Sequence, residues 1–154
     1  NAASTLVGQN LGAKMPDRAE RSVWITGYLN MAFMGIISIF LLLFPEFWIS
    51  IFMADTTVVA EGVTSLRILS YGFILYGLGM VVIQGFNGSG DTFTPTWVNG
   101  ICFWFMEIPL AYILAITFDF GLEGACYAII ISESMLTLIS LFLFRRGKWK
   151  LREV

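Results

Sequence analysis

The chain has 154 residues, of which 57% are hydrophobic and only 13% carry a charge, and its net charge is −2. In soluble domains roughly a quarter of the residues are charged, so a soluble globular domain is excluded. A disordered chain is also excluded, because so apolar a sequence does not stay solvated when it is unfolded. Without histidine, and with two cysteines, the chain cannot build histidine-based metal sites, Ser-His-Asp triads or a disulfide framework. The net charge is negative, so the composition does not indicate the basic surface that binds nucleic acid. We therefore expect an all-α, polytopic transmembrane helical bundle.

The first part of the chain reads as the end of one helix followed by a complete membrane span. Residues 1–13 are typical of closing helical turns, with Gly12 as the C-cap. Asp17 is expected to cap the next helix, because a glutamate follows three residues later. A charge-free stretch of about 23 residues then exceeds the roughly 30 Å of a hydrocarbon core, which predicts a span over 21–44. The chain thus begins as though cut from inside a helix.

Three further apolar stretches predict three further spans, each joined to the next by a short loop. Thr94 precedes Pro95, which is expected at the first position of the third of the four full spans. Pro109 lacks a backbone N–H and is expected to kink this span. The later spans and the tail that follows them are expected at 61–86, 95–118, 121–144 and 145–154.

The basic residues predict the orientation of the bundle. Of the nine lysines and arginines, eight precede the first full span or follow the last one, and four crossings bring those two regions to one side. The positive-inside rule makes that side cytoplasmic, so we expect a multi-pass protein of the plasma (inner) membrane with a cytoplasmic C-terminus. The basic cluster after Phe144 is expected to anchor this topology; the alternative is that it also holds anionic lipid headgroups.

Two glutamates are the candidates for cation or proton coupling. Glu133 lies about twelve residues, or roughly 18 Å, into its span and therefore near the midplane. Glu107 lies at a similar depth in the preceding span. Charges at this depth are costly and often functional, which favours titrating or cation-coordinating groups. The alternative is that both are neutral, hydrogen-bonded contacts that only stabilise the bundle.

Four other side chains are candidates for lining a polar cavity: Asn30, Arg67, Tyr71 and Thr137. Asn30 continues a stripe of polar residues at helical spacing, although such a stripe also serves helix–helix packing. Arg67 alternatively extends to the outer interface. The residues form no catalytic constellation, so we expect neither an enzyme nor a cofactor beyond a coupling Na⁺ or H⁺.

Several segments, in order, resemble the multidrug and toxic compound extrusion (MATE) family. AASTLVGQNLGAKMPDRAER resembles the end of that family's eighth helix and its following loop, and GSGDTFTPTW resembles the loop before the eleventh helix. EIPLAYILA, GLEGACYAIIISES and FRRGKWK resemble its last two helices and tail. The resemblance implies a twelve-helix transporter of two lobes, of which this chain would be most of the C-terminal lobe.

The resemblance also implies a function, namely efflux of small cationic or amphipathic compounds by Na⁺ or H⁺ antiport with alternating access. The implied partners are these substrates, membrane lipids and the N-terminal lobe of the same protein, with no nucleic acid. The family's coupling acids lie on its first, seventh and tenth helices, and the tenth-helix equivalent, 61–86, has no carboxylate in its apolar interior. Glu107 and Glu133 therefore rest on burial alone. The alternatives are a flippase for lipid-linked oligosaccharides of the same superfamily, an integral-membrane enzyme and a non-transporting scaffold.

Overall fold

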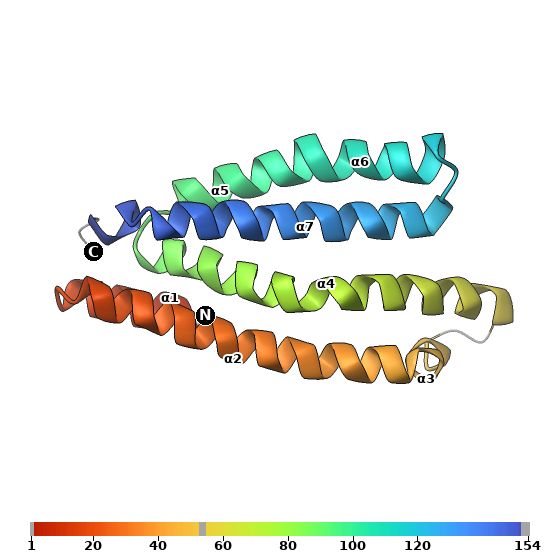
Figure 1. Ribbon diagram of the computed structural model, residues 1–154, viewed down its shortest axis with the longest axis horizontal. Helices are drawn as coiled ribbons and strands as arrows, with labels where there is room; N and C mark the ends of the chain where they lie inside the picture. The colour runs from red at the N-terminus through yellow and green to blue at the C-terminus, as the bar shows by residue number, and fades with distance from the viewer. Residues whose placement is uncertain (1, 53–54, 152–154) are drawn as a thin grey trace.

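The structure is a computed structural model and describes residues 2–52 and 55–151. All regular elements in these residues are helices (Figure 1). Four helical segments are long and apolar enough to cross a membrane: α2 (Pro16–Leu43), α4 (Thr56–Gly88), the segment Phe93–Thr117 and α7 (Gly121–Arg145). The predicted all-α fold with four spans is confirmed, and each expected span overlaps one of these segments.

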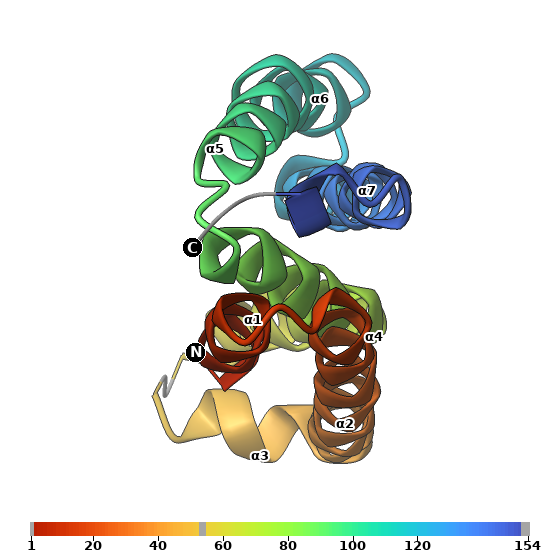
Figure 2. The ribbon, with the colours of Figure 1, turned by 90° about the vertical axis from the view of Figure 1, so that its left-hand side faces the viewer.

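The four long segments lie side by side in the order α2, α4, α7 and Phe93–Thr117, which differs from their order in the sequence (Figures 1 and 2). The short α1 (Ala2–Gly12) packs against both α2 and α4. At the other end of the bundle, α3 (Pro45–Ser50) packs against α4. Helices α4 and α7 therefore form the interior, and the outer segment depends on α7 for nearly all of its contacts.

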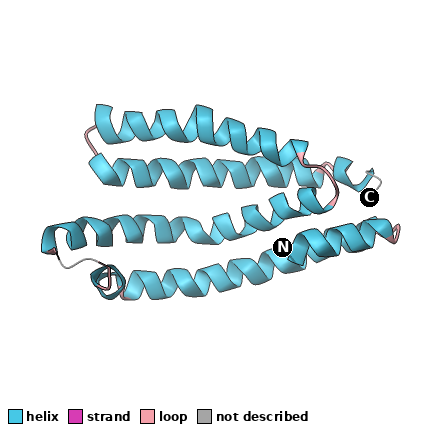
Figure 3. Cartoon of the chain, turned by 180° about the vertical axis from the view of Figure 1, so that it is seen from behind, coloured by secondary structure: helices cyan, strands magenta, loops and turns pink. Residues whose placement is uncertain are grey.

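The outer segment Phe93–Thr117 is not a uniform α-helix. It consists of α5 (Phe93–Gly100), the π-helix η1 (Ile101–Glu107), α6 (Ile108–Tyr112) and the π-helix η2 (Ile113–Thr117). In the π stretches each N–H reaches one residue further back, and Phe118 N–H accordingly donates to Ile113 O at 3.0 Å. The helical ladder is thus altered on both sides of Pro109. In Figure 3 the segment still runs as one rod along α7.

The start of α2 differs from its prediction. The N-cap residue is Met15, it makes no side-chain cap, and Pro16 is the first helical residue. The capping role predicted for Asp17 is therefore wrong, because the proline, whose missing N–H is harmless there, already starts the helix one residue earlier. The predicted C-cap role of Gly12 is also not seen in its backbone, since the left-handed residue after α1 is Lys14, with φ 58°.

The start of α5 also differs from its prediction. Thr92 is the N-cap and Phe93 the first helical residue, so Pro95 occupies the third position rather than the first. The Asp91 carboxylate accepts hydrogen bonds from the backbone N–H (3.2 Å) and the hydroxyl (2.7 Å) of Thr94. This acidic side chain satisfies a free N–H of the first turn, which lets the helix begin before the proline.

One end of the bundle gathers the basic segments. The loop between α1 and α2, the start of α5 and the 3₁₀-helix η3 (Lys148–Leu151) all lie at the left-hand end of Figure 1, away from α3. The core at this end includes the fully buried Val7, Val23, Val82 and Phe144. Seven of the eight basic residues thus lie in described segments that share one end, as their placement before and after four crossings predicts, and Arg152 lies outside the described residues.

Candidate functional site

Glu107 and Glu133 line the same cavity, although the sequence places them on different spans. The cavity has a volume of about 260 Å³ and lies between η1 and α7, which leaves room for several water molecules. Both glutamates are half-buried. The other lining residues are Asn99, Gly100, Cys102, Phe103, Trp104, Ser132 and Leu136. The structure therefore joins two separate candidates into one site.

The charge environment of the cavity is negative. Glu107 and Glu133 bring two carboxyl groups to its wall. Within residues 2–52 and 55–151, salt bridges join Lys150 to Asp17 and Glu20 and give neither cavity glutamate a basic partner. Two acids that share a site inside an apolar span cannot both stay charged without a counter-ion. The arrangement is suited to holding a proton or a small cation.

One glycine of α7, about two turns before the cavity residue Ser132, brings this helix close to the outer segment. A Cβ atom added at Gly124 would lie 2.7 Å from the carbonyl carbon and oxygen of Leu114 and 2.8 Å from Ala115 N. Helix α7 and η2 thus approach each other at backbone distance. Gly121, Ala128 and Ser132 form a face of small residues on this helix, of which Ala128 and Ser132 are buried and Gly121 is exposed. The close contact itself falls on the neighbouring face.

Thr137, one of the predicted cavity-lining residues, is packed against α4. Thr137 is fully buried, and its hydroxyl lies 2.9 Å from Glu133 O and 3.2 Å from Leu75 O. Its side chain fills the space left by Gly79, where an added Cβ would collide with it. The structure places Thr137 between two helices, and its predicted role in lining a cavity stays a prediction.

A second cavity lies at Asn30, one of the predicted cavity-lining residues. It has a volume of about 500 Å³ between α1, α2 and α4, and Thr26 and Gln84 also contribute polar groups to its wall. The Asn30 amide donates to Gly77 O at 2.7 Å and so also joins α2 to α4. The remaining lining is apolar: Ala2, Ala3, Leu29, Phe33, Met34, Met80 and Val81. A mostly apolar wall with a few polar groups is typical of small-molecule sites.

The other two candidates lie on the exposed surface of α4. Arg67 is exposed, and Tyr71 keeps 70% of its surface accessible. Their roles stay predictions. Sequence reasoning missed Met80 and Gln84, which face the second cavity with Asn30. Residues four positions apart lie on one face of a helix, so this spacing could have indicated that they face the same space.

A family model and several named proteins match this chain. The family model described as MatE matches residues 1–113. The chain belongs to the MatE family. It is accordingly a multi-pass membrane protein of a transporter family, and the predicted membership is confirmed, whereas the enzyme alternative is set aside.

Named relatives of this MATE chain come from bacteria and plants. "Probable multidrug resistance protein NorM" of Thermotoga maritima is 27% identical over 99% of the chain and 33% of its own length. The protein with the same name from Caulobacter vibrioides is 27% identical over 99% of the chain and 32% of its own length. "Protein DETOXIFICATION 36" of Arabidopsis thaliana is 30% identical over 96% of the chain and 29% of its own length. The chain thus spans about a third of these relatives.

Proposed function

We propose that this MATE chain forms most of the C-terminal lobe of a secondary active exporter of small cationic or amphipathic compounds. The exporter exchanges its substrate for Na⁺ or H⁺ by alternating access in the plasma membrane, with its C-terminus in the cytoplasm. The observation that carries the proposal is the shared cavity of Glu107 and Glu133, two acids without a basic partner among the described residues. The names of the relatives, which refer to multidrug resistance and detoxification, support the same substrate class.

The coupling step follows from the repulsion between the two acids. Two ionised carboxylates in this cavity would repel each other, and a bound proton or Na⁺ removes that repulsion. Because Glu107 belongs to η1 and Glu133 to α7, occupancy favours a closer approach of these two segments. A ligand shifts a conformational equilibrium only through such a difference in binding between two states.

The second cavity is suited to the exported compound. Its methionines and aromatic ring provide an adaptable apolar surface, and Asn30 and Gln84 provide polar contacts. The rest of the binding space would come from the N-terminal lobe. This division separates the cation site, between η1 and α7, from the substrate surface on α1, α2 and α4.

The test uses the full-length protein in proteoliposomes, with a fluorescent cation as the substrate. Glu133→Gln and Glu107→Gln should each lower gradient-driven transport at least about tenfold, equivalent to about 1.4 kcal/mol. Their melting temperatures should stay close to that of the wild type, because glutamine keeps the size of the side chain. The matched control is Glu123→Gln, which removes an exposed acid from the first turn of α7 and should leave transport unchanged.

Separate Na⁺ and pH gradients identify the coupling ion. Normal transport by both cavity variants would refute the coupling role of the two glutamates. Substrate movement that ignores both gradients would refute antiport. Gradient-independent translocation of a lipid-linked oligosaccharide would instead support the flippase alternative.

A further inference from the structure

A third cavity lies toward the basic end of the bundle; on α7 its lining begins at Ile139, about one turn beyond Leu136 of the glutamate cavity, and the two cavities share no lining residue. Its volume is about 440 Å³, and it is formed by α5, α7, η3 and the loop after α4. Its inner wall is apolar, with Val98, Ile101, Ile139 and Leu143. Its rim carries two basic side chains and two aromatic ones: Arg146, Lys148, Phe93 and Trp97. The cavity thus combines an apolar groove with a cationic mouth.

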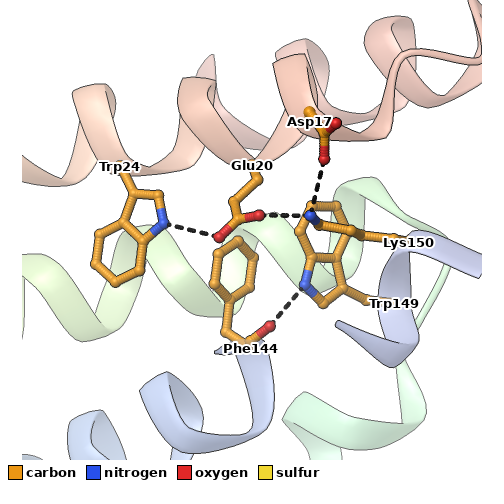
Figure 4. A network of polar contacts seen from close by, with 6 residues as sticks. All are labelled: Asp17, Glu20, Trp24, Phe144, Trp149 and Lys150. Carbon is orange, nitrogen blue, oxygen red and sulfur yellow. Dashed lines mark hydrogen bonds and ion pairs between the residues drawn. The ribbon is translucent and has the colours of Figure 1, made fainter. Parts of the chain in front are cut away.

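The two basic residues of the rim are attached to an ordered turn rather than to a loose tail. Gly147, with φ 72°, reverses the chain after α7. Trp149 is 1% exposed, stacks on the Phe144 ring at 4.6 Å and donates to Phe144 O at 2.9 Å (Figure 4). This buried indole fixes the position of the adjacent Lys148.

Contacts with α2 and within α7 hold the same turn from two further sides. The Lys150 ammonium binds the carboxylates of Glu20 at 2.5 Å and Asp17 at 3.2 Å (Figure 4). The Arg146 guanidinium lies 5.4 Å over the Phe142 ring, a favourable cation–π arrangement. Arg146 and Lys148 therefore present two positive charges at a defined edge.

The charge of the rim matches a singly charged anion. Among the described residues that line the cavity, Asp91 is the one acid, and its carboxylate accepts the hydrogen bonds from the backbone N–H and the hydroxyl of Thr94 at the start of α5. Two basic groups and one acid leave a net charge of +1 on the lining. A phosphodiester carries one negative charge and would balance it.

We propose that this cavity is a binding site for an anionic phospholipid. The phosphate lies between Arg146 and Lys148, and an acyl chain follows the groove between α5 and α7. The groove favours a lipid over free phosphate, because an inorganic anion would leave the apolar wall uncovered. The exposed Phe93 and Trp97 suit the boundary between headgroups and acyl chains, where aromatic side chains are enriched. This site is independent of the coupling acids.

The test is native mass spectrometry of the purified full-length protein titrated with phosphatidylglycerol. Each basic group near an anionic headgroup contributes about a factor of five in affinity, so Arg146→Gln should weaken binding about fivefold and Arg146→Gln with Lys148→Gln about thirtyfold. The matched control is Arg145→Gln, which removes the same charge one residue earlier. Arg145 lies over the Trp24 ring and outside the cavity lining, so this control should change binding less than twofold.

Two further arms separate the lipid from other anions and from a nonspecific basic surface. Ile101→Trp, at a half-exposed position of the groove, should weaken phosphatidylglycerol binding by obstructing the acyl chain. Phosphatidylcholine and inorganic phosphate should both bind at least about tenfold more weakly than phosphatidylglycerol. Equal losses for Arg145→Gln and Arg146→Gln would overturn the site in favour of general attraction to the basic tail. Inorganic phosphate that binds as tightly as the lipid would overturn the lipid assignment.

Discussion

Replacing Gly124 by alanine should push η2 away from α7, at the far end of the outer segment that also carries Glu107. The added methyl group would lie 2.7 Å from two backbone atoms of Leu114, whereas carbon atoms pack at about 3.5–4.0 Å. Backbone cannot rotate away as a flexible side chain does, so η2 must move from α7 by about 1 Å. Such overpacking costs about 1–3 kcal/mol. Alanine recovers about 0.5–1 kcal/mol of helix propensity, so the net loss lies between about 0 and about 2.5 kcal/mol, with a central value of about 1 kcal/mol.

The assay for Gly124→Ala combines two readouts on the full-length protein. Thermal unfolding in detergent should show a lower melting temperature, and gradient-driven transport in proteoliposomes should fall, because a shift of η2 also changes how η1, with Glu107, lies against α7. The matched control is Gly12→Ala, since an added Cβ there meets nothing within 4 Å. This control should be neutral or slightly stabilising. If Gly124→Ala unfolds at the wild-type temperature, the close approach of α7 and η2 is not required, and the reasoning is refuted.

Two further predictions concern contacts that join distant parts of the chain. The hydrogen bond to Glu20 raises the pKa of Lys150 above its ordinary 10.5, so its stabilisation is complete below that value and is lost as the pH rises through the folded-state pKa. Between about pH 8 and about pH 12, the free energy of unfolding of the wild type should therefore fall by roughly 1 kcal/mol. Lys150→Met lacks the ion pair at every pH and should not show this fall. Identical pH profiles for the two proteins would contradict the ion pair. Asn30→Leu removes the 2.7 Å hydrogen bond to Gly77 O and should lower stability by about 1 kcal/mol; an unchanged melting temperature would show that this bond contributes nothing.

The membrane spans could be predicted because composition alone determines them. A charge-free stretch such as 22–44 has no stable place outside a membrane, whatever its neighbours are. Helix starts were less predictable, because several local patterns compete at each start. Helix α2 begins at Pro16 and not after a cap by Asp17. Helix α5 begins at Phe93, before Pro95, where the Asp91 carboxylate accepts a hydrogen bond from the Thr94 N–H.

The sequence indicated the two glutamates of the candidate site, but it did not indicate that they line one cavity. Burial indicated Glu107 and Glu133 separately, since both are charged groups deep in apolar stretches. Their common cavity depends on which helices are neighbours, and α7 lies between α4 and the outer segment rather than at an edge. The sequence pattern contains no such information. A helical wheel at 100° per residue also fails within η1, where π-type hydrogen bonds change the rotation.

The contact of the tail with α2 was also beyond sequence reasoning. Lys150 and Glu20 are 130 residues apart, and a basic cluster at the end of a span ordinarily serves only as a topology anchor. Trp149 gave no clear signal either, because tryptophan is enriched at membrane boundaries whether or not it packs against the protein. Its burial against Phe144 makes the tail part of the bundle.

The two π stretches have a consequence for how relatives should be aligned. A π turn contains one residue more than an α turn between its hydrogen-bonded ends, so η1 and η2 each accommodate an extra residue without adding a loop. Relatives that lack such a residue would carry a one-position gap inside an uninterrupted helix, where gaps are normally forbidden. Alignments that permit a gap in 101–107 and again in 113–117 would keep both glutamates in register with their true counterparts.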